Sequence, residues 1–158
     1  MTTVTIPTLE KVMTLAATID PPQQVSDDLS IYNVPGGRIF SDGFTASIIA
    51  PSADWARPVS SNVIGLDVRL SSHTESGHYL YLTYFGRVVI NDEVAPKKAS
   101  GEKIHGSEMY FTASPVAKTN DPQLAWMNDT IFFGKMQRNT MAGANGQGHP
   151  VQDIYKVV

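Results

Sequence analysis

An acidic and a basic residue, Asp67 and Arg69, lie two positions apart in the alternating segment Val63 to Leu70. Successive side chains of a β-strand point to opposite faces, so a strand here would place the carboxylate and the guanidinium on the same face. We expect this face to line an interior cavity, in which Asp67 acts as a general acid or base and Arg69 polarises a substrate oxygen. The alternative is a structural ion pair on an exposed sheet face, and the pattern allows both.

A second alternating segment, His78 to Phe85, carries Tyr79 and Tyr81 on one face. Tyrosine favours strands for packing reasons alone, so most of these rings should simply pack. A hydroxyl aimed inward would instead orient a carbonyl group or supply a proton. We therefore predict Tyr81 as a third catalytic residue, and Tyr79 and Tyr110 as substrate contacts.

Each of the two tryptophans lies close to a polar side chain: Asp54 precedes Trp55, and Asn128 follows Trp126 by two positions. In one interpretation Asp54 is a carboxylate at the rim of a cavity, the tryptophans form its wall, and Asn128 donates to a ligand carbonyl. In the other, the aspartate caps a turn, the tryptophan plugs the end of the fold, and the asparagine satisfies backbone groups of a loop. We retain all four as candidate substrate-binding residues.

Several other chemistries lack their sequence patterns. The chain contains no cysteine, so disulfides and thiol chemistry are excluded. Its four histidines form neither H-x-H nor H-x-x-x-H, which argues against a metal site. There is no phosphate-binding glycine loop between a strand and a helix, and no G-x-S-x-G nucleophile motif. We expect neither a metal nor a cofactor.

Alternating segments recur along the chain and would position these residues. The expected strands are residues 10–19, 30–34 with 38–40, 44–50, 63–70, 78–85, 87–91, 109–115, 130–136 and 151–158. An Asn-Asp-Pro sequence at 120–122 predicts the start of one short helix, whereas 92–107 reads as a surface excursion. The glycine-rich segment 141–150 predicts a loop, of which 143–148 would form a lid.

About eight short strands with hairpin-length connections predict an all-β barrel or sandwich. We favour an antiparallel up-and-down β-barrel with one short helix, because closure removes the free edges of a sheet. The interior of a barrel with about eight strands is filled by side chains or holds one small ligand.

The composition fits a single domain spanning residues 1–158, with 42% hydrophobic residues and a formal net charge of −3. Acidic and basic residues are interspersed, which argues against a nucleic-acid partner. The N-terminal residues lack the basic and apolar regions of a secretion signal, and no run approaches the roughly 18 apolar residues that span a bilayer. We therefore expect a cytoplasmic protein with no membrane partner.

Several short motifs occur in an order that resembles one known family. They are Gly36-Gly37, Ser52-Ala53-Asp54-Trp55, Leu66-Asp67-Val68-Arg69, Tyr110-Phe111 with Pro115, Ala125-Trp126-Met127-Asn128 and Phe132-Phe133-Gly134. The resemblance runs from about Thr8 to the C-terminus, and the family is the small β-barrel family catalogued as domain of unknown function 3237. It implies an oligomeric barrel of the allene-oxide-cyclase-like kind, with no generally established activity and with some members beside natural-product genes. The chain departs from the family pattern at Pro51-Ser52, where Gly-Gly is usual, and in a longer glycine-rich loop before the last strand.

Together these observations predict a cofactor-independent enzyme that acts on a small, natural-product-like molecule in the barrel cavity, by isomerisation, cyclisation, dehydration or lyase chemistry. The alternatives are a non-catalytic, calycin-like carrier of a similar small-molecule ligand and a structural oligomer without a usable cavity. If Asp67 faces the cavity, the aliphatic residues of its strand point outward and need cover from another subunit. We therefore expect a homo-oligomer, a dimer or larger. The aliphatic residues in question are Ile64, Leu66, Val68 and Leu70.

Overall fold

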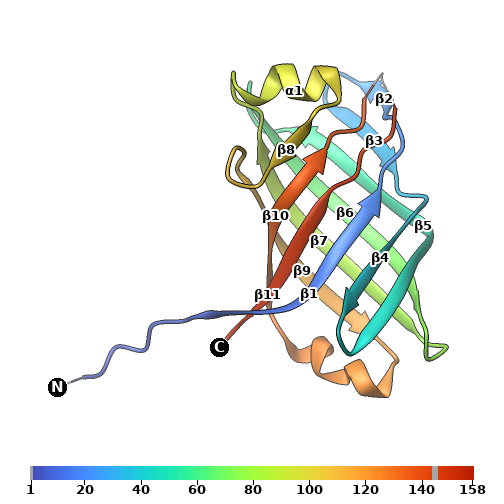
Figure 1. Ribbon diagram of the computed structural model, residues 1–158, viewed down its shortest axis with the longest axis vertical. Helices are drawn as coiled ribbons and strands as arrows, with labels where there is room; N and C mark the ends of the chain where they lie inside the picture. The colour runs from blue at the N-terminus through green and yellow to red at the C-terminus, as the bar shows by residue number, and fades with distance from the viewer. Residues whose placement is uncertain (1, 144–145) are drawn as a thin grey trace.

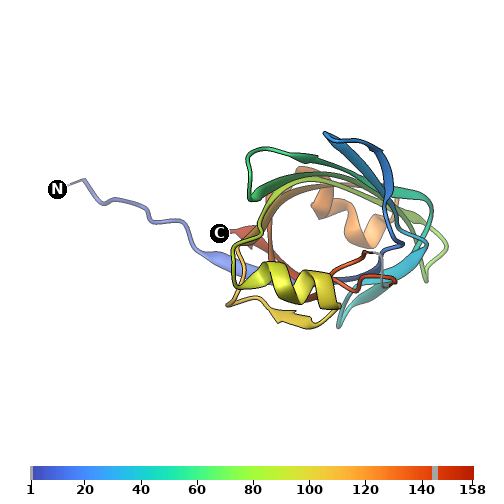
Figure 2. The ribbon, with the colours of Figure 1, turned by 90° about the horizontal axis from the view of Figure 1, so that it is seen from above.

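The structure is a computed structural model that describes residues 2–143 and 146–158. Its strands close into an antiparallel barrel, seen from the side in Figure 1 and as a ring from above in Figure 2. In chain order the elements are β1 (Leu9–Thr18), β2 (Gln23–Ser26), β3 (Leu29–Asn33), β4 (Gly36–Ser41), β5 (Phe44–Pro58), β6 (Val63–Thr74), β7 (Tyr79–Val89), α1 (Val94–Ser100), β8 (Lys103–His105), β9 (Phe111–Thr119), the 3₁₀ helix η1 (Pro122–Asp129), β10 (Phe132–Thr140) and β11 (Val151–Val157).

Eight strands of the described residues form the closed ring, in the spatial order β1, β11, β10, β9, β7, β6, β5 and β4, and β4 pairs back with β1. The β2–β3 hairpin extends the sheet along the second half of β5, and β8 pairs with the end of β10. The predicted antiparallel up-and-down barrel is therefore confirmed. The structure adds one helix to the prediction, because α1 forms within the segment 92–107 that the sequence analysis treated as an irregular excursion.

Burial alternates strictly along β7 and identifies its inner face. Leu80 and Leu82 are completely buried, whereas Tyr79 and Tyr81 are exposed on the outside of the barrel. This two-residue period is the one that the sequence predicted for the segment. The apolar set of side chains therefore points to the barrel centre.

The aliphatic row of β6 also faces the centre, contrary to the prediction. Val68 and Leu70 are 4% and 1% exposed, while the side chains of Asp67 and Arg69 are 35% and 49% exposed. The prediction that the charged pair lines the interior, with the aliphatic row turned outward toward another subunit, is therefore wrong. Burying the aliphatic row removes apolar surface from water, whereas the reverse arrangement would desolvate two ions.

Strand β5 is longer than the sequence analysis expected. The chain was predicted to leave the sheet at Pro51, but β5 continues to Pro58 through a register shift between Ile49 and Ser52. At this bulge the hydroxyl of Ser52 donates to the carbonyl of Ile49 at 2.7 Å and accepts from the backbone N–H of Ser71 at 2.9 Å. These side-chain bonds bridge the interruption in the ladder, so Asp54 lies inside a strand rather than in a turn.

The two helices lie at opposite ends of the barrel, α1 at the upper end in Figure 1 and η1 at the lower end. Asp121 caps η1 by accepting from the backbone N–H of Gln123 at 2.9 Å, and Pro122 follows at the first helical position. The predicted helix start is therefore confirmed. Leu124 and Met127 are buried, so η1 closes its end of the barrel with apolar side chains. Neither helix of the described residues is long and apolar enough to cross a bilayer.

Candidate functional site

A cavity of about 80 Å³ lies inside the barrel, near the end where β1 and β10 finish and β11 begins. A water molecule needs roughly 10–15 Å³ of such space, so the cavity holds several waters or a small organic group. Most of its wall is aliphatic, as at Val68, Leu70 and Met141. The polar side chains that line it are Tyr32, Asp54, Tyr84 and Asn139, and no lysine, arginine or histidine lines it among the described residues.

Asp54 projects from β5 into this apolar surrounding and is only 7% exposed. Its Oδ1 accepts the backbone N–H of Asp67 at 3.0 Å, at a point where β5 and β6 have no paired residues between Asp54↔Val68 and Arg57↔Gly65 in the described ladder. Burial raises the pKa of Asp54 to about 7, opposed by that hydrogen bond and reinforced by the charge of Asp67. Both protonation states of the carboxyl are therefore populated near neutral pH, which suits a general acid or base.

Tyr84 enters the cavity from β7 as the polar residue of an otherwise apolar inner face. Nε2 of the buried Gln152 donates to its hydroxyl oxygen at 3.0 Å. Burial, with a smaller contribution from the charge of Asp54, raises the pKa of Tyr84 far above its usual range. The phenol therefore stays neutral, and its own O–H hydrogen remains available for donation because the Gln152 contact uses only its oxygen.

Tyr32 and Asn139 complete the polar lining. Tyr32 on β3 is paired with Asp54 in the β3–β5 ladder, so the two side chains lie on the same face, and burial followed by the charge of Asp54 raises the pKa of Tyr32. Asn139 is 6% exposed and lies just after a register shift of β10 between Met136 and Arg138, which turns it inward. Its Oδ1 has no hydrogen-bond partner.

Comparison with known families settles the membership of the chain. The family model described as "Protein of unknown function (DUF3237)" matches residues 7–157. The chain belongs to the DUF3237 family. Its sequence is 24% identical over 109 residues to a UPF0311 protein of Rhodopseudomonas palustris, a match that covers 69% of this chain and 71% of the relative.

Solved structures share the fold of this barrel. A conserved protein of unknown function from Rhodopseudomonas palustris superposes with a TM-score of 0.84 at 21% identity, covering 99% of this chain and 100% of that one. A structure described as an enzyme from Penicillium herquei superposes with a TM-score of 0.64 at 14% identity, covering 99% of this chain and 98% of that one. At such identities the likeness shows the fold alone.

Three of the residues predicted for the site lie together on the outside of this DUF3237 barrel. Oδ1 of Asp67 is 3.6 Å from the nearer Arg69 nitrogen, and the guanidinium of Arg69 lies over the Trp55 ring at 4.9 Å from its centroid. The expected inward placement of these residues is wrong. The structure corresponds to the alternative that the sequence left open, a structural ion pair on an exposed sheet face, here stacked on an aromatic ring.

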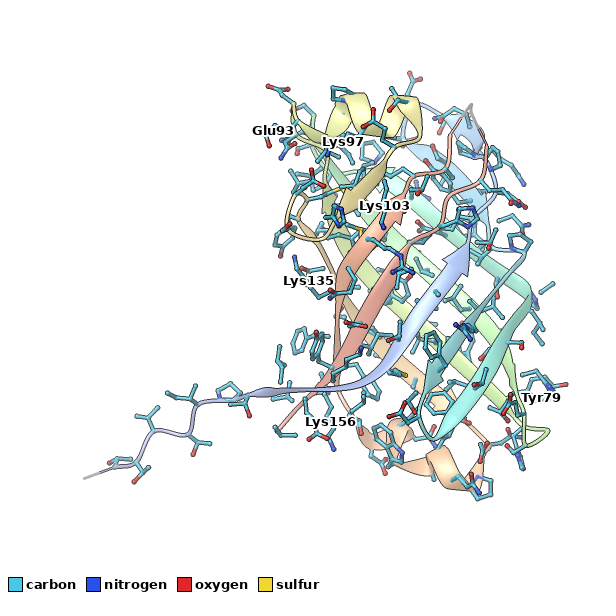
Figure 3. The ribbon with its side chains drawn as sticks, viewed as in Figure 1. Tyr79, Glu93, Lys97, Lys103, Lys135 and Lys156 are labelled. Carbon is cyan, nitrogen blue, oxygen red and sulfur yellow. The ribbon has the colours of Figure 1, made fainter. Side chains whose placement is uncertain are left out.

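The predicted tyrosines also point outward. Tyr79, Tyr81 and Tyr110 are 56%, 39% and 56% exposed, and Tyr79, labelled in Figure 3, lies at the outer edge of the barrel. Tyr79 and Tyr81 occupy the opposite phase of the β7 alternation from Tyr84, and Tyr110 immediately precedes β9. The prediction that the hydroxyls of Tyr79, Tyr81 and Tyr110 line the cavity is therefore wrong, and the tyrosine of β7 that does line it is Tyr84.

Trp126 and Asn128 lie at η1, away from the cavity. Trp126 is 41% exposed and packs edge-on against Phe132 with ring centroids 6.0 Å apart. Asn128 accepts the backbone N–H of Thr119 at 2.8 Å and donates to the Thr119 carbonyl at 3.1 Å. Asn128 thus satisfies backbone groups at the end of β9, as the second interpretation proposed.

Asp54 is the only residue of the predicted set that lines the cavity. Tyr84, Asn139, Tyr32 and the supporting Gln152 were missed. A signal existed for Tyr84, since it alternates in phase with Leu80 and Leu82 and must share their side of the sheet. The predicted lid at 143–148 includes residues 144–145, which lie outside the described residues. Within the described residues no group of three or more side chains is arranged to hold a metal ion.

Proposed function

We propose that the barrel cavity is an active site in which Asp54 moves a proton on a small, mainly apolar organic molecule without a cofactor. The observation that carries this proposal is a buried carboxyl group with a pKa of about 7 in an aliphatic cavity. A carboxyl group with an ordinary pKa would be ionised throughout at neutral pH and would be a weak base. The surroundings of Asp54 therefore match those of groups that accept and return protons during catalysis.

The arrangement supports proton abstraction next to a carbonyl group. Asp54 takes a proton from carbon, the C–H electron pair moves toward the carbonyl oxygen, and the neutral Tyr84 donates its O–H to the oxygen as negative charge develops. Protonated Asp54 then returns the proton to another carbon, which is an isomerisation, or to a departing hydroxyl group, which is a dehydration. A cyclisation or lyase step that passes through an enolate would use the same two groups, with Asp54 taking a proton from carbon and returning it to the atom on which negative charge is left.

The fold is compatible with such a role, since the neighbouring structure from Penicillium herquei is described as an enzyme. One observation favours a second candidate, a non-catalytic binding protein. Asp54 is the only group lining the cavity, among the described residues, whose pKa lies close to neutral, so Tyr84 can donate a hydrogen bond to an oxyanion but no second group titrates near pH 7 beside the base.

Exchange of the α-protons of cyclohexanone in D₂O, followed by ¹H NMR, tests the proposal. We expect the wild-type protein to accelerate exchange over buffer, with a rate that rises as Asp54 ionises around pH 7. Asp54→Asn should lower the protein-catalysed rate by about 100-fold or more, since a positioned base typically contributes that much.

Asp67→Asn is the matched control, because it removes a carboxylate close to Asp54 but on the outer face. This variant should keep the wild-type plateau rate, with the pH midpoint slightly lower because the Asp67 charge raises the pKa of Asp54. Equal rates for wild type and Asp54→Asn would refute the acid–base role. Cyclohexanone that binds but does not exchange would identify a carrier instead.

A further inference from the structure

Gln152 is a buried amide on the inner face of β11. It is only 2% exposed, and its ladder partners, Leu15 of β1 and Met136 of β10, are buried apolar residues. An amide in such surroundings loses its hydration, and hydrogen bonds within the protein must replace it. Among the described residues the side chain of Gln152 makes one such bond, from Nε2 to the hydroxyl oxygen of Tyr84 at 3.0 Å. The amide is therefore tied to the phenol that lines the cavity.

Two small residues leave room for this amide to cross the inside of the barrel from β11 to Tyr84 on β7. The strands between them, β10 and β9, pair here through Gly134 and Ala113. Oε1 of Gln152 lies 2.3 Å from the point that a Cβ atom on Gly134 would occupy, and Cβ of Ala113 lies 3.5 Å from the same point. A side chain at Gly134 would therefore displace the amide from its place beside Tyr84.

The amide presents its donating end to the phenol. Because Oε1 lies against Gly134 and Nε2 only donates, the O–H of Tyr84 cannot donate to this amide and is left for another acceptor. Burial raises the pKa of Tyr84, and the hydrogen bond from Gln152 opposes that rise. The same bond therefore makes the phenol a stronger hydrogen-bond donor, as expected when one hydrogen bond polarises the next.

We propose that Gln152 is a positioning residue, whose hydrogen bond turns the O–H of Tyr84 toward the carbonyl oxygen of a ligand in the cavity, and that Gly134 keeps the space for it. This inference rests on the proposed function in taking the cavity as the substrate site and Tyr84 as the donor. Gln152 does not itself line the cavity, so it acts only through Tyr84.

Binding of cyclohexanone labelled with ¹³C at its carbonyl tests the inference, because the carbonyl carbon moves downfield in the NMR spectrum when its oxygen accepts a hydrogen bond. Extrapolated to saturation, the signal with wild-type protein should lie downfield of the signal with Tyr84→Phe. Gln152→Met should move it most of the way to the Tyr84→Phe position. This variant should also lower the rate of α-proton exchange by about tenfold, less than the loss from removing an oxyanion donor outright.

A double-variant comparison shows whether Gln152 acts through Tyr84. In the Tyr84→Phe protein, adding Gln152→Met should change neither the carbonyl signal nor the exchange rate further. Met136→Leu is the matched control, because it alters the buried ladder partner of Gln152 without removing a donor, and it should keep the wild-type signal. A wild-type signal in Gln152→Met, or an equal effect of Gln152→Met with and without Tyr84, would overturn the inference.

Gly134→Ala tests the same inference with both Gln152 and Tyr84 still present. The added Cβ atom should push the amide aside and move the carbonyl signal in the same direction as Gln152→Met. Methionine fills nearly the same space as glutamine, so we expect Gln152→Met to unfold close to the wild-type thermal midpoint. A Gln152→Met protein that does not fold would show that the amide holds the barrel together instead, and would also overturn the inference.

The two proposals fail in different experiments. If Asp54 is needed for exchange but Gln152→Met and Gly134→Ala leave the carbonyl signal unchanged, the proposed function stands and the inference about Gln152 is wrong. If the carbonyl signal depends on Gln152 but the wild-type protein does not accelerate exchange, Gln152 positions a donor for a bound ligand and the acid–base role of Asp54 is wrong.

Discussion

At the scale of single residues, Asp54 combines the local chemistry of a carboxyl group with an environment that disfavours its charge. The side chains of Val68, Leu70 and Tyr84, which line the same cavity, favour the protonated carboxyl group of Asp54. The ionised carboxylate accepts one hydrogen bond from the backbone, the N–H of Asp67. The same burial that makes Asp54 a candidate acid or base therefore strains the folded protein when the carboxyl ionises. The unfolding free energy of the protein should therefore depend on pH through the raised pKa of Asp54.

We expect the stability of the wild type to fall as the pH rises from 5 to 8. Asp54 has a pKa of about 7 in the folded protein against an ordinary value of 3.8, so folding favours the protonated form and loses this advantage as the pH passes through 7. The shift corresponds to a loss of about 3 kcal/mol in unfolding free energy over this range. Urea denaturation at several pH values measures it.

Asp54→Asn should remove most of this slope and be the more stable protein at pH 8, because Asn keeps an oxygen for the Asp67 N–H without a charge. The range above pH 5 avoids the carboxyl groups whose pKa is lowered by hydrogen bonds, such as Asp20 and Asp121, since these affect stability only at lower pH. Equal slopes for the two proteins would show that Asp54 is not the titrating group.

At the scale of elements, the barrel depends on close approach of β4 to β1 beside the cavity. Gly37 of β4 has a φ of 123° and pairs with Ala17, and Ala17 lines the cavity. A Cβ atom on Gly37 would lie 2.3 Å from the carbonyl oxygen of Ala16. Neither the backbone conformation nor the space therefore tolerates a side chain.

Gly37→Ala should lower the unfolding free energy by about 2 kcal/mol or more, because it combines a strained backbone with a backbone clash. Gly36→Ala is the matched control, since a Cβ atom there has nothing within 4 Å and the φ of Gly36 is ordinary. Urea denaturation of the two variants compares them directly. Similar stability losses would mean that β4 can move away from β1 without penalty.

At the scale of the whole molecule, two groups of apolar side chains are exposed among the described residues. Residues 2–8 extend away from the barrel in Figure 1, with Val4 and Ile6 79% and 76% exposed. A groove on the outer face of β7, β9 and β10 is lined by aromatic rings, of which Phe85, Tyr110 and Phe133 are 65%, 56% and 40% exposed. The expected homo-oligomer remains a proposal, and these residues replace the β6 row as its basis.

We propose a homodimer in which the N-terminal arm of one protomer lies on the aromatic groove of its partner. The arm is uncharged from residue 2 to residue 8, carries Val4, Ile6 and Pro7 between threonines, and can extend about 20 Å. It therefore suits the exposed aromatic rings of the groove, whose lining also includes Arg87, Thr112 and Ser114. Light scattering at micromolar concentration should show a dimer for the wild type. Deletion of residues 1–7 and Phe85→Ser should each give a monomer.

Val25→Ser is the control for the dimer, because Val25 is 58% exposed on β2, outside the groove. This variant should remain a dimer. A monomeric wild type, or a dimer that survives both the deletion and Phe85→Ser, would contradict the proposed interface.

The sequence by itself determined most of the local structure and the class of the fold. Alternation identified β1, β6 and the first part of β7, because a two-residue period is a property of each strand alone. The separate strands expected at 78–85 and 87–91 are one continuous strand, β7. The cap at Asp121 and Pro122 predicted η1 for a similarly local reason. Pro51 misled the prediction for β5, because the hydroxyl of Ser52 compensates for the interrupted ladder through a contact with β6 that no local pattern shows.

Only the tertiary structure decided which face of each strand is inside and which polar groups meet there. Alternation assigned Asp67 and Leu70 to opposite faces but could not say which face the closed barrel would bury. Closure buried the aliphatic faces and brought Asp54, Tyr84 and Asn139 together from β5, β7 and β10. These residues lie up to 85 positions apart (139 − 54). Their meeting, and the raised pKa of Asp54 that follows from it, depends on long-range packing rather than on any sequence pattern.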